Sequence, residues 1–501
     1  MQVFVEPGMQ KMKVVVIGSG IAGLSASAYL AKAGMEVTVL EKNDQAGGRA
    51  RKYEYQGFTF DMGPSWYWMP EIFEQFYNDF AHTASDFYTL KRLDPSYRIF
   101  DKSGEAVDVP AHMDALEKLF EHYEPGSSAG LRKFLAEAQF KYDTGMRHLV
   151  HKPGLNLTEF LDARLLKGLL HLDVFTSMKK HIRRFVRHPF LIELLEFPVL
   201  FLGATPANTP ALYSLMNYAD LSLGTWYPMG GMFNIIHAFV QIAEEQGVKI
   251  RLNTEVKRIE TRHGKVYRVH LENGETLEAD YVVGAADYHH IDQHLLDEKD
   301  RAYSPRYWES RKMAPSCLLY YVGVNKPLQN LQHHNLFFDA DFNRHAADIY
   351  SNPQWPSHPL FYASLPGKTD PSVMPQGCEN LFLLMPVAPG LPDSESMRER
   401  YFDMLLQRLE QRTGQAIAPH ILFKRSYAMN DFTRDYNAFK GNAYGLANTL
   451  RQTALFKPRM KSKKINNLYY TGQLTVPGPG VPPAIISGKV VARLICQNST
   501  H

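Results

Sequence analysis

The sequence contains few cysteines, little excess charge and no long hydrophobic run. Cys317, Cys378 and Cys496 are the only cysteines in 501 residues, and no two of them form a CxxC pair. This spacing predicts reduced, structural thiols in a cytoplasmic setting. The formal net charge is only +3, which argues against nucleic acid as a main partner.

No apolar run reaches the roughly 18 uninterrupted residues of a membrane span, so any membrane contact is expected to be peripheral. The N-terminus, MQVFVEPGMQKMK, contains Glu6 and Pro7 and lacks the apolar core of a secretory signal. About the first ten residues are expected to form a tail. With 45% hydrophobic and 21% charged residues, the chain is expected to be globular, with two or three structural units.

A strand, a turn, a helix and a second strand open the fold. Val14–Ile17 is a continuous apolar run, typical of a strand buried on both faces. A helical pattern that closes at Gly34 and a second buried strand, Glu36–Leu40, follow, and Glu41 comes directly after them. The turn between the first strand and the helix has the spacing GxGxxG and consists of Gly18, Ser19, Gly20, Ile21, Ala22 and Gly23.

This βαβ unit predicts a dinucleotide site. The first glycine makes the tight turn, the second lets the backbone approach a diphosphate, and the third lets the helix pack on the strand. The diphosphate would lie on the free N–H groups at the helix N-terminus, and Glu41 can accept hydrogen bonds from ribose hydroxyls. An ordinary glycine-rich turn is the alternative, which the flanking strands and helix disfavour.

Gly47, Gly48 and Arg49 follow shortly after Glu41. They form either a flexible basic loop or a second contact with the same dinucleotide, in which Arg49 addresses a phosphate or a flavin oxygen. Together with the first motif, this glycine pair resembles the GG-doublet flavoproteins, which include amine oxidases, carotenoid desaturases and GDP-dissociation inhibitors. The resemblance implies FAD as the cofactor rather than NAD.

Two segments combine aromatic residues with glycine and proline. FTFDMGPSWYWMP contains Gly63 and Pro64, followed by three aromatic residues at 66–68. GTWYPMGGM, Gly224–Met232, has the same character and precedes a helical pattern. The aromatic side chains belong either to the core or to a surface that faces flavin or substrate.

The stretch TGQLTVPGPGVPPAIISG, Thr471–Gly488, places glycines and prolines before an apolar helix. The glycines allow close approach to a flat ring, and the prolines fix the path of the backbone. The helix would offer its N-terminal N–H groups to the electron-rich edge of the flavin. The expected contacts in this stretch are Gly472, Gln473, Gly480 and Val481.

Longer blocks of the chain resemble the bacterial phytoene desaturases of carotenoid synthesis. These blocks are DMGPSWYWMP, LFLGATPANTPALYSLMNYADLSLGTWYPMGGM, GNAYGLANTLRQTALFKPR and NLYYTGQLTVPGPGVPPAIISGK. The likeness runs from about Lys13 to Leu494, and the blocks keep their order. Gln473-Leu474, Val476 and Pro479 depart from the broad family pattern, which indicates a subgroup and leaves the substrate and the number of desaturation steps open.

The resemblance implies an FAD-dependent desaturase of C40 polyenes, with phytoene to lycopene as the default reaction. Flavin N5 would accept a hydride and a proton would leave the substrate, and the delocalised allylic cation demands no strong base. Oxygen or a quinone would then accept the electrons. The alternatives are a 1-hydroxycarotenoid 3,4-desaturase or a carotenoid isomerase on the same scaffold and, in a different class, a non-enzymatic lipid or prenyl carrier.

The resemblance also implies further site residues. The backbone of Val256 would pair with the adenine, and Lys42 is expected to contact the cofactor beside Glu41. Any catalytic carboxylate would border the apolar helical region, where Glu196 and the pair Asp143 and Arg147 are candidates, with structural ion pairs as the alternative reading.

No metal site is expected, because the adjacent pairs His289-His290 and His333-His334 lack the i, i+4 spacing that places two imidazoles on one helix face.

The segment Met178–Leu202 brings basic side chains close to apolar ones. Its cations are Lys179, Lys180, Arg183, Arg184 and Arg187. They form either a solvated helix face or a patch that meets anionic lipid. Because phytoene dissolves in the bilayer, we expect a peripheral protein on the cytoplasmic side of a membrane.

The expected fold is α/β, with a three-layer Rossmann-like FAD-binding domain assembled from residues 12–105, 221–295 and 431–497. A helical, membrane-facing region for substrate entry is expected at residues 106–220, and an interleaved mixed-sheet substrate domain at 296–430.

Overall fold

The computed structural model describes residues 11–156, 173, 176–202, 205–449, 452–453 and 456–499, without the side chains of residues 148 and 200–202. The expected N-terminal tail, residues 157–172 of the expected helical region, and Gly203 and Ala204 of the LFLGATP block lie outside these residues.

A five-stranded parallel sheet forms the core of the first domain. Its strand order is β19-β13-β1-β2-β9, and every neighbouring pair is parallel. The strands are β1 (Lys13–Ile17), β2 (Glu36–Leu40), β9 (Lys249–Arg251), β13 (Tyr281–Gly284) and β19 (Leu468–Tyr470). The sheet therefore takes strands from each of the three stretches that were predicted to build the Rossmann-like domain, and the α/β fold class is confirmed.

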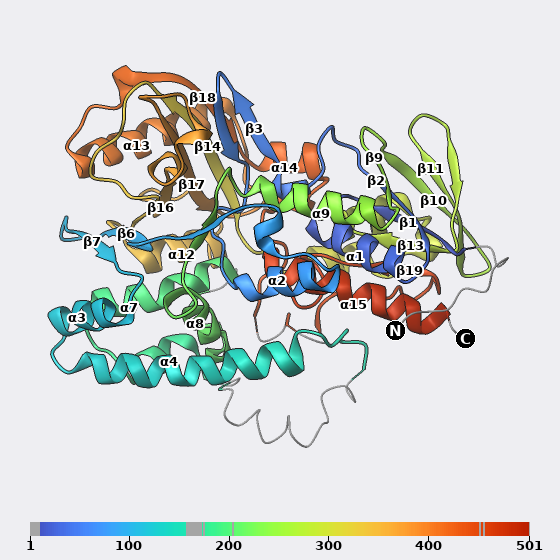
Figure 1. Ribbon diagram of the computed structural model, residues 1–501, viewed down its shortest axis with the longest axis horizontal. Helices are drawn as coiled ribbons and strands as arrows, with labels where there is room; N and C mark the ends of the chain where they lie inside the picture. The colour runs from blue at the N-terminus through green and yellow to red at the C-terminus, as the bar shows by residue number, and fades with distance from the viewer. Residues whose placement is uncertain are drawn as a thin grey trace.

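Three helices lie beside this sheet, and the first of them packs against the other two (Figure 1). They are α1 (Ile21–Lys32), α9 (Phe233–Glu245) and α15 (Val481–Ser499). Small residues allow α1 and α15 to approach closely: a Cβ on Gly488 would lie 2.6 Å from the carbonyl oxygen of Ala22. The Ser25 hydroxyl also donates to the Ile485 carbonyl at 2.9 Å. This tight contact joins the first helix of the chain to the last one.

Shorter elements surround the parallel sheet. A three-stranded antiparallel sheet contains β10 (Val256–Arg262), β11 (Lys265–Leu271) and β12 (Thr276–Glu278). Two further antiparallel pairs are the hairpin of β3 (Lys52–Tyr55) and β4 (Phe58–Asp61), and the long-range pair of β5 (Leu90–Arg92) with β8 (Trp226–Pro228). The connecting helices are α2 (Pro70–Asp79), α10 (Tyr288–His290) and α11 (Pro305–Glu309).

A seven-stranded mixed sheet forms the core of the second domain, with the order β18-β14-β17-β16-β15-β6-β7. Its strands are β6 (Tyr97–Phe100), β7 (Ala106–Val109), β14 (Ser316–Val324), β15 (His334–Phe337), β16 (Phe361–Ser364), β17 (Glu379–Val387) and β18 (Ile421–Tyr427). Its helices are α12 (Phe342–Tyr350), α13 (Glu395–Thr413) and α14 (Met429–Tyr436). The pairing of β6 with β15 shows that the chain enters this sheet before residue 105, so the boundary expected there falls between two strands of the second domain.

A group of helices lies below the mixed sheet in Figure 1. The described helices are α3 (Met113–Tyr123), α4 (Ser127–Thr144), α6 (Met178–Ile182), α7 (Pro189–Glu196) and α8 (Leu215–Leu221). These helices lie within residues 106–220, where a helical region was expected, although β7 occupies its first four residues; that the region faces a membrane stays a prediction. Within the described part of the chain, no helix combines the length and the apolar character that crossing a bilayer requires.

Candidate functional site

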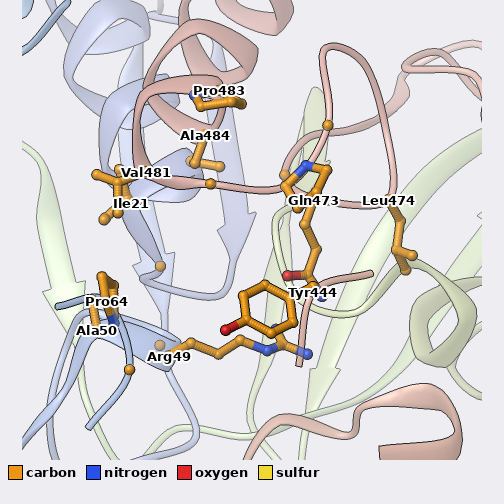
Figure 2. Close-up of a pocket in the computed structure, with 18 of the residues that line it drawn as sticks. Ile21, Arg49, Ala50, Pro64, Tyr444, Gln473, Leu474, Val481, Pro483 and Ala484 are labelled. Atoms are coloured by element: carbon orange, nitrogen blue, oxygen red, sulfur yellow. The ribbon is translucent and has the colours of Figure 1, made fainter. Parts of the chain in front are cut away.

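One cavity of about 590 Å³ extends from the glycine-rich turn to the helical region and the mixed sheet. At one end it is lined by Gly20, Glu41, Lys42, Thr254 and Val256. At the other end its walls are mainly apolar, and they include Trp66, Trp68, Met69, Met146, Leu149, Val150, Leu212, Leu215, Met216, Leu319 and Leu384. In Figure 2, side chains from the N-terminal and C-terminal segments of the chain enclose the same space.

The glycines of the first turn differ in what surrounds them. A Cβ on Gly23 would lie only 2.2 Å from the Gly18 carbonyl oxygen, so this glycine is required for the packing of α1 on the turn. A Cβ on Gly20 would meet no atom within 4 Å, although Gly20 has an ordinary extended backbone with φ −65° and ψ 166°. The space next to Gly20 is open because glycine has no side chain there, and we call this space the cradle.

The N-terminus of α1 faces this cradle. No side chain caps the helix, and its first turn contains no acidic residue. Its first N–H groups and its dipole therefore provide a site for an anion, as a diphosphate requires. The cradle and the uncapped helix together fit the phosphate part of a dinucleotide.

Glu41 is held in a fixed position at the end of β2. Its Oε2 accepts from the backbone N–H of Ser19 at 2.9 Å and from the Ser19 hydroxyl at 2.8 Å. Its Oε1 accepts from the backbone N–H of Asn43 at 2.9 Å. A carboxylate in this position can still accept hydrogen bonds from ribose hydroxyls through its remaining lone pairs.

Arg49 lies in the middle part of the cavity, near Tyr444 and Gln473 (Figure 2). One of its terminal nitrogens donates to the Asn442 carbonyl at 3.1 Å, and its guanidinium lies 5.3 Å from the centre of the Tyr436 ring. Its Nε has no partner among the described residues. Burial lowers the pKa of Arg49, because little solvent reaches this charge. An arginine with a free donor suits contact with an electron-rich oxygen of a cofactor.

The C-terminal turn forms a second wall of the cavity. Gly472 is fixed by Ser487 of α15, whose hydroxyl accepts from the Gly472 N–H at 2.7 Å, and by Thr475, whose hydroxyl donates to the Gly472 carbonyl at 2.8 Å. The turn then continues through Gly478 and Gly480 directly into α15. The backbone, rather than large side chains, thus forms this surface.

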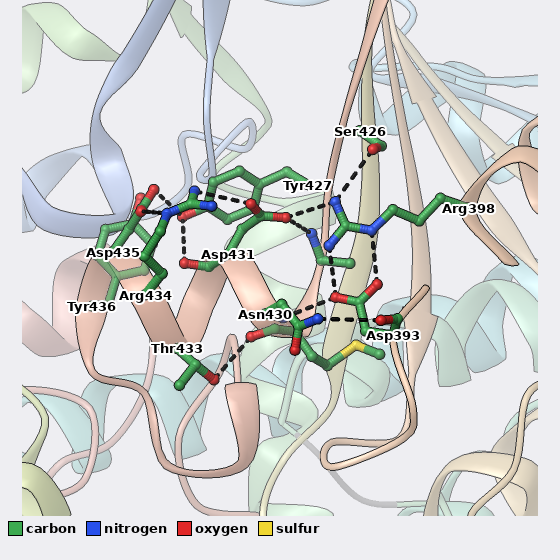
Figure 3. A network of polar contacts seen from close by, with 12 residues as sticks. Asp393, Arg398, Ser426, Tyr427, Asn430, Asp431, Thr433, Arg434, Asp435 and Tyr436 are labelled. Carbon is green, nitrogen blue, oxygen red and sulfur yellow. Dashed lines mark hydrogen bonds and ion pairs between the residues drawn. The ribbon is translucent and has the colours of Figure 1, made fainter. Parts of the chain in front are cut away.

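A polar network ties α14 to the cavity (Figure 3). Arg398 contacts Asp431 at the start of α14, and Arg434 contacts both Asp431 and Asp435. Asp435 lines the cavity and accepts from Arg51 at 2.9 Å. This network positions the last turn of α14 over the end of the cavity that holds Glu41.

The aromatic cluster at residues 66–68 divides between two roles. Trp66 and Trp68 line the cavity, and Trp66 stacks on His334 with ring centroids 4.2 Å apart. Tyr67 does not line the cavity; it is fully buried and stacks on Phe73 at 4.1 Å. The core reading therefore holds for Tyr67, and a surface of Trp66 and Trp68 that faces flavin or substrate stays a prediction.

The structure brings the predicted cofactor residues together. Every predicted residue except Ser19 and Gly23 lines the cavity, namely Gly18, Gly20, Ile21, Ala22, Glu41, Lys42, Gly48, Arg49, Gly63, Pro64, Val256, Gly472, Gln473, Gly480 and Val481. Ser19 instead supports Glu41, and Gly23 lies against Gly18. Contact of these residues with FAD remains a prediction.

The three catalytic candidates lie elsewhere. Glu196, Asp143 and Arg147 are absent from the described residues that line the cavity. Glu196 is buried and paired with Arg183, and burial raises the pKa of its carboxyl while the hydrogen bond from Arg183 opposes this rise. This favours the structural reading for Glu196, whose catalytic role stays untested.

We expect Glu196→Gln to leave turnover within about twofold of the wild type, because the amide keeps a hydrogen bond to Arg183 and touches no cavity atom. Steady-state turnover at equal flavin content is the measurement. A loss of tenfold or more would instead establish a role for Glu196 in the reaction.

Several cavity residues carry no role in the sequence prediction. They are Asn43, Thr254, Asp287, Tyr362, Asp435, Tyr436, Asn437, Tyr444 and Asn448. Tyr444 and Asn448 belong to the block GNAYGLAN, whose glycines and asparagines were the one available signal. The other residues are brought to the cavity by tertiary contacts, which could not be predicted from their order in the sequence.

One acidic and histidine cluster lies outside the cavity, at Glu137, Asp173 and His181. The Lys141 ammonium occupies its centre, 2.9 Å from Asp173 and 3.1 Å from Nε2 of His181. The ammonium of Lys141 thus already takes the place that a metal ion would need between these side chains.

The family model described as flavin containing amine oxidoreductase matches residues 21–496. The chain is 40% identical to a carotenoid 3,4-desaturase of Haloarcula japonica, over 97% of this chain and 98% of that protein. It is 32% identical to a zeta-carotene-forming phytoene desaturase of Myxococcus xanthus, over 96% of this chain and 93% of that protein. Among solved structures, an oxidoreductase from Methanosarcina mazei has a TM-score of 0.61 at 19% identity, and the match covers 96% of this chain and 100% of that one, which supports the fold.

Proposed function

The chain belongs to the family of flavin-containing amine oxidoreductases, and from this premise we propose that it is an FAD-dependent carotenoid desaturase, an oxidoreductase that acts on CH–CH groups. The observation that carries the proposal is the continuity of the cavity, which joins a dinucleotide cradle to a mainly apolar chamber. The carotenoid desaturases among its relatives cover almost the whole chain.

The residues of the cavity fit FAD. The open cradle at Gly20 and the uncapped N-terminus of α1 suit the diphosphate, and Glu41 suits a ribose. Bound FAD supplies a two-electron acceptor. The glycine-rich turn and the C-terminal wall would hold the cofactor between them, with Arg49 beside it; these residues all line the same cavity.

A carotenoid offers almost no polar group, so its recognition depends on shape and on burial of apolar surface. The apolar end of the cavity, with Trp66, Met146 and Leu384 among its walls, provides such a surface. Formation of one double bond removes a hydride and a proton from adjacent carbons. The chain then has to position those carbons and exclude water, and the delocalised cation loses its proton without a strong base.

The finer reaction that we propose is 3,4-desaturation of a carotenoid. The relative with 40% identity carries that name, and the departures of Gln473-Leu474, Val476 and Pro479 from the broad family pattern leave the substrate open. Conversion of phytoene to lycopene, the default expectation from the sequence, is the second candidate; the Myxococcus xanthus relative, named a zeta-carotene-forming phytoene desaturase, supports phytoene as a substrate but not lycopene as the product. Oxygen or a quinone is the proposed final electron acceptor.

Pigment analysis tests both reactions. The chain is expressed in one set of cells that accumulates phytoene and in another that accumulates lycopene, and the carotenoids are separated by chromatography. A product with one added 3,4 double bond in the second set alone supports the proposed reaction, and lycopene in the first set supports the alternative. A purified protein that takes up no flavin and leaves both pigments unchanged would instead fit a carrier.

We further propose that the protein binds to the surface of a membrane through the basic side chains of residues 179–187. All five cations are exposed, while Met178, Ile182 and Val186 are buried in the core. These three apolar residues are therefore unable to enter lipid, and the proposed attraction is mainly electrostatic. Each cation near an anionic surface contributes about 1 kcal/mol.

Charge reversal tests this surface. Arg183 and Arg184 pair with Glu196 and Asp173, so the variant changes Lys179, Lys180 and Arg187 to glutamate. We expect roughly a hundredfold loss of binding to vesicles that contain anionic lipid, as measured by flotation, because three attractions of about 1 kcal/mol are removed. Binding to neutral vesicles is the control, and equal flotation of both proteins on anionic vesicles would contradict the proposal.

A further inference from the structure

Lys457 is a buried cation without a partner. Its side chain is 4% exposed, and its ammonium makes no hydrogen bond or ion pair with any described residue. Lys141, another buried lysine, is by contrast compensated by Asp173 and His181. Burial alone lowers the pKa of Lys457 to about 7, since no neighbouring charge offsets it.

The ammonium of Lys457 lies directly behind the C-terminal wall of the cavity. A Cβ built on Gly478 would be 2.8 Å from Nζ of Lys457, so the glycine leaves the space that the ammonium fills. Gly478 itself lines the cavity. Only one layer of backbone therefore separates this charge from the space in front of the wall.

Asn448 lies beside the same glycine. Its Oδ1 would be 3.5 Å from the Gly478 Cβ position, lacks a hydrogen-bond partner among the described residues, and belongs to a side chain that lines the cavity. The ammonium of Lys457 and Oδ1 of Asn448 thus both lack a hydrogen-bond partner among the described residues, and both lie next to Gly478.

An uncompensated buried ammonium is costly for folding. A methionine would fill a similar volume without that cost. Lys457 therefore does not stabilise the fold through its charge, and the presence of a charge at this position needs another explanation.

We propose that Lys457 is a positioning residue that places a positive potential on the C-terminal wall and so raises the electron affinity of the flavin in the cavity. In this water-poor environment a charge acts through the thin wall with little screening. Gly478 admits the ammonium and Asn448 borders it on the cavity side. The inference rests on the FAD of the proposed function but not on the identity of the carotenoid.

The midpoint potential of the FAD-loaded protein at pH 6, where a lysine with a pKa of about 7 is mostly protonated, tests the proposal. In Lys457→Met we expect at least a tenfold less favourable two-electron reduction, which is a fall of about 30 mV. The Lys457→Arg variant keeps the charge and is expected to stay within threefold of the wild type. Lys463→Met removes an exposed cation from the same segment and is expected to leave the potential unchanged.

Thermal unfolding separates this role from a structural one. Because Lys457→Met removes an unpaired buried charge, we expect it to unfold at a higher temperature than the wild type while its potential falls. A variant that is less stable and keeps the wild-type potential would overturn the inference. A protein that binds no FAD would refute the proposed function instead, so the two failures are distinguishable.

Discussion

Replacement of Gly20 by alanine is expected to remove FAD from the protein without unfolding it. The new Cβ would meet no protein atom within 4 Å, and the backbone of Gly20 is one that alanine adopts readily. The methyl group would occupy the cradle at the N-terminus of α1, where the diphosphate of the cofactor needs close contact with the backbone. We expect at least a tenfold weaker affinity for FAD, which is about 1.4 kcal/mol, and a larger loss with valine.

Titration of the apoprotein with FAD measures this affinity, and thermal unfolding of the apoprotein measures the fold. Gly23→Ala is the matched contrast, because its Cβ would lie 2.2 Å from the Gly18 carbonyl oxygen. That variant is expected to be destabilised even without cofactor. If Gly20→Ala retained wild-type affinity, the diphosphate would have to bind elsewhere.

Replacement of Arg398 by methionine is expected to destabilise the protein by about 3–5 kcal/mol. Arg398 makes two hydrogen bonds to Asp393, at 2.7 and 2.6 Å, and an ion pair with Asp431 at 2.8 Å (Figure 3). The Asp393 side chain is only 1% exposed, so removal of the arginine leaves a buried carboxylate without its cation. Urea unfolding of the apoprotein is the measurement.

The pH dependence of this loss has a defined sign. Burial is the largest influence on the pKa of Asp393 and would raise it, but the hydrogen bonds from Arg398 and from the Asn430 N–H, together with the charge of Arg398, outweigh burial and lower the pKa. A lowered carboxyl pKa stabilises the folded state fully above the unfolded-state pKa of about 3.9, and this stabilisation is lost as the pH falls through the lower pKa of the folded state. The difference in the free energy of unfolding between wild type and Arg398→Met should therefore be largest at pH 7 and decrease in acid.

Lys257→Met is the control for Arg398→Met. Lys257 pairs with Glu272 on the surface, where both side chains are more than half exposed. Its loss is expected to cost less than about 1 kcal/mol. Equal losses of stability from the two substitutions would show that the contacts of Arg398 stabilise the protein no more than a surface ion pair does.

The parts of the site that the sequence predicts are those in which the backbone itself is the binding surface. Gly20, Gly48 and Gly480 could be recognised because only glycine permits such close approach, and glycine spacing is visible in one dimension. Asp435 and Tyr436 reach the cavity from α14, which directly follows β18, a strand placed by its long-range pairing with β14. No local pattern marks such residues.

The fold, like the site, has parts that the sequence predicts and parts that it does not. Two of the parallel strands, predicted at Val14–Ile17 and Glu36–Leu40, were evident from short apolar runs, but the assignment of β6 and β7 to the second sheet was not. A short strand reads the same in either sheet, and only its partner decides where it belongs. Glu196 shows the limit for catalytic residues: its place near apolar helices suggested chemistry, whereas its contact with Arg183 favours packing.

The position of β19 and α15 also determines when the cofactor can bind during synthesis. The glycine-rich turn follows β1, which ends at Ile17, but the opposite wall leads from β19, which begins at Leu468, into α15. At about 5–20 residues per second, a ribosome needs roughly 20–90 s to synthesise the chain between them. Throughout that time the nascent chain has a diphosphate cradle and no surface to cover the flavin ring. Stable FAD insertion is therefore expected only after β19 and α15 have been synthesised and have folded.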